Sequence, residues 1–163
     1  MNRGSTAFLR VAVIIIGIPI LALCIFLLPQ IAMVATDQAR QGATLAYVVF
    51  GILFIMYVTA IPFYYALYQA LKLLKFIDED EAFSQISVIA LRKIKRCAII
   101  ISGLYILALP LIYVVAEWDD APGLILIGMV IVGASAVVAV FAAVLQKLLQ
   151  EAIRIKSEND LTV

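Results

Sequence analysis

Four long apolar runs are the feature that most limits how this 163-residue chain can fold. Each is long enough to cross a bilayer, since about 20 consecutive apolar residues span the hydrocarbon core. In lipid every backbone amide must bond within its own segment, so we expect helices and not strands. The predicted spans cover residues 8–28, 44–71, 97–116 and 122–145. We therefore predict an all-α fold, an integral membrane four-helix bundle that forms a single domain over residues 1–163.

The composition fits a membrane protein and removes several classes of function. The chain is 66% hydrophobic and 14% charged, whereas soluble domains carry about 25% charged residues. It has no histidine, which removes the commonest general base and metal ligand. Cys24 and Cys97 are far apart in sequence and lie in or beside apolar runs. We expect them to be core side chains, with no disulfide, metal or other cofactor.

The basic residues predict the orientation. Of the 12 Lys and Arg residues, Arg40 alone falls on one side of the predicted membrane. The rest lie in the N-terminal segment, the second connection and the C-terminal tail. Because basic loops stay in the cytoplasm, both termini are predicted to be cytoplasmic, and the protein to reside in the bacterial cell (inner) membrane.

Ionisable side chains are nearly absent from the spans. Beyond Arg10, close to the start of the first run, the spans contain no Asp, Glu, Lys or Arg. Ion and proton pathways depend on such groups inside the membrane. Intramembrane proteolysis would also need a catalytic carboxylate pair, a serine with a base, or a zinc motif. We therefore do not expect an enzyme, and the sequence argues against a transporter.

Small and aromatic side chains cluster in two of the spans. Ser135, Ala139 and Ala143 are four residues apart in the fourth span, a spacing that lets helices approach closely. This row packs either on the other helices or on a second copy in a homo-oligomer. In the second span, Tyr64, Tyr65 and their aromatic neighbours are typical of a membrane-interface belt, with a lipid or cofactor pocket as the alternative.

The second connection predicts a helix that begins outside the membrane, over residues 85–96, and runs into the third span. Ser84 has the character of an N-cap, and Phe83 and Val88 have the spacing of a hydrophobic staple. A basic cluster lies at the membrane end of this helix: Arg92, Lys93, Lys95 and Arg96. We expect these four to bind lipid headgroups of the bilayer and not nucleic acid directly, because they lie against lipid.

The tail predicts a similar extension of the fourth span, over residues 146–158. Apolar side chains recur there at helical spacing. Lys147 with Glu151, and Arg154 with Glu158, are four apart and can form ion pairs on the opposite face. The apolar faces of the two cytoplasmic extensions must be covered by each other, by the membrane or by a partner.

Two stretches carry a resemblance to a known family. They read AFSQISVIALRKIKRCAI over residues 82–99 and VLQKLLQEAIRIKSENDLTV over residues 144–163. With the four-span layout between them, they resemble the bacterial membrane family known as domain of unknown function 2975. The family has no assigned reaction. The resemblance implies a gene context, because its genes often lie beside a small helix-turn-helix regulator of the Cro/CI type.

Our preferred hypothesis is a regulatory or anchoring membrane protein that binds such a regulator in the cytoplasm. The candidate contact residues are those that carry the resemblance: Phe83, Ser84, Leu91, Glu158, Asn159, Asp160, Leu161, Thr162 and Val163. For Leu161, Thr162 and Val163 two alternatives remain. They dock on Phe83 and Ser84 or on a partner, or they form a frayed and solvated helix end. The alternatives are an oligomeric small-molecule transporter and an immunity or stress-protection protein.

Overall fold

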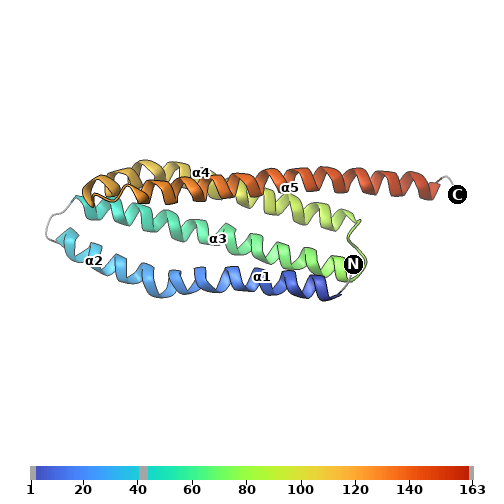
Figure 1. Ribbon diagram of the computed structural model, residues 1–163, viewed down its shortest axis with the longest axis horizontal. Coiled ribbons are helices and arrows are strands. Elements are labelled where there is room, and N and C mark those ends of the chain that lie inside the picture. Colours follow the sequence, from blue (N-terminus) through green and yellow to red (C-terminus); the bar gives the residue numbers. More distant parts are fainter. Residues whose placement is uncertain (1–2, 41–43, 162–163) are drawn as a thin grey trace.

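The computed structural model describes residues 3–40 and 44–161, and it contains no strand within those ranges. The helices are α1 (Arg3–Ala22), the π-helical turn η1 (Leu23–Leu27), α2 (Leu28–Arg40), α3 (Leu45–Asp78), α4 (Gln85–Trp118) and α5 (Gly123–Leu161) (Figure 1). In this part of the chain, four helical stretches are long and apolar enough to cross a membrane, with α1, η1 and α2 forming the first. The all-α, four-span fold class is therefore confirmed, and the cytoplasmic placement of the termini stays a prediction.

The helices pack in the order in which they occur along the chain. In the described residues, α5 packs on α4, α4 on α3, and α3 on α1 and α2. The N-terminus, the turn between α3 and α4, and the C-terminus lie at one end of the molecule (Figure 1). We call this the polar end. The turn between α4 and α5 lies at the opposite end.

The first span continues through Pro29, where the sequence predicts that it stops. The reason is the π-helical turn directly before that proline. The Leu28 amide bonds the Leu23 carbonyl, and Pro29 has no amide hydrogen to offer, so the Cys24 carbonyl loses its helical donor. The Tyr57 hydroxyl donates to this oxygen at 2.8 Å. A side chain of α3 thus satisfies the backbone group that the break exposes, and the helix goes on to Arg40.

Polar contacts hold α1 on α3 along most of their length. Tyr64, seven residues after Tyr57 on the same face of α3, donates from its hydroxyl to the Gly17 carbonyl at 2.9 Å. A Cβ added to Gly17 would lie 3.2 Å from the Leu67 side chain, so this glycine permits the close approach. These tyrosines therefore hold two helices together, beyond the interface-belt role that the sequence suggests.

Small residues are buried on both α4 and α5, which pack on each other. Gly128, Ala139 and Ala142 of α5 are buried, as are Ala98 and Ala108 of α4. The Ser102 hydroxyl donates to the Val132 carbonyl across this interface at 3.4 Å. Within the small-residue row of the fourth span, Ala139 is thus buried on the neighbouring helix, whereas Ser135 and Ala143 are half-buried. Packing of this row on a second copy stays a prediction. Large apolar side chains face outward instead, as expected for surfaces in contact with lipid.

Two short turns with the same local design end α3 and α4. Asp80 and Asp120 each have a positive φ, of 59° and 50°. The amide that follows each of them bonds a carbonyl five residues back, from Glu81 to Phe76 and from Ala121 to Ala116. This pattern is the Schellman motif, and Asp tolerates the left-handed position better than most residues. The acidic run at residues 78–81 therefore ends α3.

Candidate functional site

The polar end of the molecule carries the candidate site, because the residues that the sequence singles out gather there (Figure 1). Among the described residues, no group of three or more His, Cys, Asp and Glu side chains is placed to hold a metal ion. The site is therefore considered as a surface for a partner or a lipid. Its parts are the end of α3, the turn at residues 79–84, the start of α4 and the extension of α5.

Asp78, the last residue of α3, ties the N-terminal part of α1 to the rest of the molecule. Its Oδ2 lies 2.8 Å from the Arg10 guanidinium. Its Oδ1 accepts a hydrogen bond from the buried Thr6 hydroxyl at 2.5 Å. The charge of Arg10, close to the start of the first span, is thus neutralised by a carboxylate 68 residues later in the chain. The sequence analysis did not predict this pair.

The turn before α4 presents an aromatic ring to solvent. Phe83 is 57% exposed. Ser84 occupies the N-cap position with extended backbone, as predicted, but its hydroxyl makes no cap bond to α4 and donates to the Glu81 carbonyl at 2.6 Å. The predicted contact residue Leu91 is only 7% exposed and packs inside the molecule. Leu91 is therefore unavailable to a partner, and we remove it from the candidate surface.

The basic cluster at residues 92–96 divides between two faces of α4. Lys95 donates to the Gln146 side chain of α5 at 3.2 Å, at the level where both helices leave their predicted spans. Lys93 and Arg96 instead line a groove between α3 and α4. Arg92 does not bond Gln146 and is not among the residues that line this groove. The four side chains predicted to act together on headgroups thus have separate surroundings, and Lys95 is engaged within the protein.

The extension of α5 is the most exposed element of the polar end. It continues as helix to Leu161, beyond the predicted end at residue 158, and projects past the turn between α3 and α4 (Figure 1). Arg154 bridges Glu151 at 2.8 Å and Glu158 at 3.5 Å. The bond to Glu151 raises the pKa of this guanidinium above its ordinary value. The prediction that Glu151 pairs with Lys147 is wrong, since its partner is Arg154.

The described tail residues, 158–161, do not fold back on the turn. Leu161 is 83% exposed, and Figure 1 shows the end of α5 well separated from the turn that carries Phe83 and Ser84. Glu158 pairs with Arg154, and Asn159 and Asp160 are exposed on the last turn of α5. Thr162 and Val163 lie outside the described residues. Among the described residues, the structure therefore does not bring residues 158–161 and the turn together within one chain.

Two glutamines that sequence reasoning did not single out are buried near this end. Gln146 accepts the bond from Lys95, and Gln69 of α3 is 3% exposed. Both were visible in the sequence as amides at the edges of apolar runs. A long amide side chain at a helix–helix contact is a common source of interhelical hydrogen bonds in membranes.

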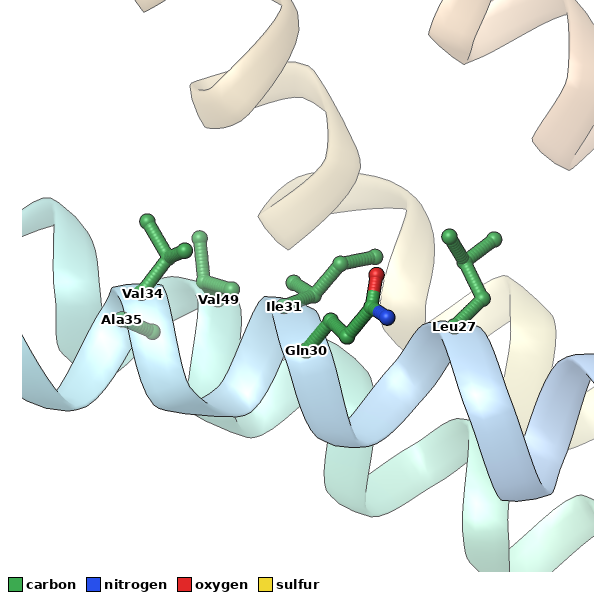
Figure 2. A pocket seen from close by; sticks show the side chains of 6 residues that line it. All are labelled: Leu27, Gln30, Ile31, Val34, Ala35 and Val49. Atoms are coloured by element: carbon green, nitrogen blue, oxygen red, sulfur yellow. The ribbon is translucent and has the colours of Figure 1, made fainter.

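A second groove lies on α2 and α3, and Figure 2 shows its lining side chains. Its volume is about 340 Å³, and it is lined by Leu27, Gln30, Ile31, Val34, Ala35 and Val49. In Figure 2 the side chains of Leu27, at the end of η1, and of Ile31 and Val34 of α2 rise from the same side of the helix. No charged residue is among these six, so this groove offers a ligand little to recognise.

Comparison with known proteins places the chain in a family. The model of the family described as Protein of unknown function (DUF2975) matches residues 33–163. The chain belongs to this family. The match begins inside α2, so α1 and η1 lie outside the family model. The DUF2975 match includes Phe83 and Ser84, the basic cluster and the whole of α5.

A full-length relative supports the membrane assignment. The chain is 60% identical over 163 residues to the uncharacterized membrane protein YoaS of Bacillus subtilis (strain 168), covering 100% of both chains. No solved structure matches the chain. The protein is thus a DUF2975 membrane protein with four helices long and apolar enough to cross the bilayer.

Proposed function

We propose that the protein is a regulatory or anchoring membrane protein that holds a small DNA-binding regulator at the cytoplasmic face. The observation that carries this proposal is the uncovered extension of α5. At 1.5 Å per residue, the 39 residues of α5 extend for about 58 Å, well beyond a hydrocarbon core of about 30 Å. A helix of this length has to leave the membrane.

The extension is poorly suited to lie along the membrane surface. From Ala134 to Leu161 the sequence of α5 contains neither Gly nor Pro, the residues at which helices bend sharply. The extension therefore continues the direction of the span and stands away from the headgroups. Leu148 and Ile155, seven residues apart on one face, are both more than half exposed. They continue the lipid-facing surface of Phe141 and Val144 into water, where an uncovered apolar stripe is unfavourable.

The start of α4 does not cover this stripe either. Ile86 and Ile89 remain substantially exposed on the extension of α4, as does Phe83 beside them. Two separate apolar patches thus face the same side of the membrane, flanked by charged side chains. A small protein that docks on both would bury apolar surface and contact the ion pairs of Arg154, a typical core-and-rim interface. The choice of a helix-turn-helix regulator rests on the family resemblance.

The proposal requires the polar end to face the cytoplasm. With Cys24 and Cys97 replaced by serine, a cysteine introduced at Lys156 is expected to be protected from an impermeant maleimide in intact cells. A cysteine introduced at Asp120 should react. This follows from the distribution of basic residues across the membrane. Labelling of Lys156→Cys in intact cells, with Asp120→Cys protected, would contradict the cytoplasmic orientation.

Capture of the neighbouring regulator tests the docking surface. The detergent-purified protein is immobilised by an N-terminal tag, and the purified regulator is added. Ile155→Asp should lower the regulator's affinity by at least about tenfold, because burying an isoleucine is worth roughly 1.5–3 kcal/mol. The matched control Gln150→Asp adds the same charge on another face of the extension, and we expect a change within about twofold. Equal retention by both variants would exclude Ile155 from the contact.

A further inference from the structure

A groove of about 570 Å³ runs between α3 and α4 on the outer surface of the molecule. Its apolar wall on α3 includes Val58 and Ile61, which is 73% exposed. Lys93 and Arg96 line it from α4. Tyr65, which also lines the groove, lies toward the end that carries these two cations, because α3 and α4 run antiparallel.

Neither cation of the groove has an ion-pair partner among the residues that the structure describes. Within the described residues, the ion pairs join Arg10 to Asp78, Lys75 to Glu79, and Arg154 to its two glutamates. Lys93 and Arg96 take part in none of these. They are three residues apart and lie just before the predicted third span, at the depth where anionic lipid headgroups are found.

The length of the groove matches one leaflet of the bilayer. From Lys93, the face of α4 continues through Ile100 to Leu104, a distance of about 16 Å along the helix. Half of the hydrocarbon core is about 15 Å thick. An acyl chain that follows this wall from the headgroup level would therefore end near the bilayer centre.

We propose that this groove binds one anionic phospholipid of the cytoplasmic leaflet. Its phosphate lies between Lys93 and Arg96, and one acyl chain lies along Val58, Ile61 and Ile100. Two charges of the same sign at one end of an apolar channel complement an anionic head on an apolar tail. This lipid site does not rest on the proposed regulator docking, which involves Ile86 and Ile89, nearer the start of α4 on the same face, and the extension of α5.

The rest of the basic cluster is excluded from this site by position. At 100° per residue, Lys95 lies about 130° around α4 from the mean direction of Lys93 and Arg96. It bonds Gln146. Arg92 does not line the groove. The structure therefore divides a cluster that looks uniform in sequence: two of its residues line the groove and two do not.

Native mass spectrometry of the full-length protein tests the site. The detergent-solubilised protein is titrated with phosphatidylglycerol, and separately with phosphatidylcholine that carries the same chains. The double variant Lys93→Gln/Arg96→Gln should lower the affinity for phosphatidylglycerol by about 30-fold, about fivefold per cation. The control Arg92→Gln/Lys147→Gln removes the same charge outside the groove, and its affinity should stay within about twofold of the original.

A third variant separates the groove from its charges. Ile61→Trp fills the apolar channel at an exposed position that tolerates a larger side chain, and leaves both cations in place. It should also weaken the binding of phosphatidylglycerol, with an unchanged thermal midpoint in lipid-free detergent. Four outcomes would overturn the proposal: an equal loss in the control, unaltered binding by Ile61→Trp, equal affinity for phosphatidylcholine, or displacement of the lipid by inorganic phosphate at the same concentration.

Discussion

Leucine in place of Gly128 is expected to destabilise the packing of α5 on α4. A Cβ at this position lies 2.9 Å from Leu109 Cδ2 and 3.2 Å from Ile112 Cδ1. The first methyl group needs only a shift of the Leu109 tip, but the three further carbons of leucine require both side chains to move. Overpacking of this kind costs about 1–3 kcal/mol.

The chain provides a matched control for this change. A Cβ added to Gly133, five residues later on the same helix, meets no atom within 4 Å. Gly133→Leu carries the same gain in helix propensity, so the difference between the two variants reports packing alone. The measurement is the free energy of unfolding by SDS titration in mixed micelles. Equal stability of the two variants would show that α4 and α5 are not in contact at Gly128.

Replacement of Asp78 by alanine is expected to release the N-terminal half of α1 from α3. The change removes the counter-charge of Arg10 and the acceptor of the Thr6 hydroxyl. Hydrogen bonds to charged groups contribute about 1.5–3 kcal/mol. Because Arg10 is partly exposed, which weakens its ion pair, we expect the loss to be near the lower end, about 2 kcal/mol.

Glu79→Ala serves as the control, because it removes the same charge one residue later. The Glu79 carboxylate is half exposed and reaches Lys75 only at 4.0 Å, so its loss should cost less than about 0.5 kcal/mol. Hydrogen exchange of the amides of α1 gives the second readout, and it should accelerate in Asp78→Ala alone. Unchanged exchange in α1 would mean that Asp78 does not hold this helix in place.

The spans could be predicted from sequence because the bilayer leaves the chain few choices. Apolar runs of sufficient length must become helices when no water is present to satisfy the backbone. The extension of α5 was also predictable, since nothing between Ala134 and Leu161 can break a helix. Local signals likewise placed Ser84 at the start of α4.

Contacts between distant segments could not be predicted in the same way. Pro29 predicts the end of a helix. The helix continues because the Tyr57 hydroxyl, 28 residues later in the chain, bonds the carbonyl that loses its helical donor, and this contact is not visible in the local sequence. In the sequence, Asp78 is one of four consecutive acidic residues. Its ion pair with Arg10 depends on the packing of α1 on α3. Periodicity indicates that the start of α4 has an apolar face, but the neighbours that bury Leu91 and leave Ile86 exposed are set by tertiary packing.

The basic cluster shows the same limit for the candidate site. The sequence gives the angular positions of Lys93, Lys95 and Arg96 around α4 and not the identity of the adjacent helices. With α5 on one side and an open groove on the other, the same three cations acquire different partners. The residues were found from sequence, and their division into two sites required the fold.

The central claim, that the extension of α5 carries a cytoplasmic regulator, is tested most directly by photocrosslinking in living cells. A benzophenone amino acid at Ile155 should form a product with the mass of the protein plus the proposed helix-turn-helix regulator. The same probe at Gln150, on another face of the extension, should give much less of it. Crosslinks from Ile155 only to a second copy of the chain or to lipid, with the regulator present, would contradict the claim.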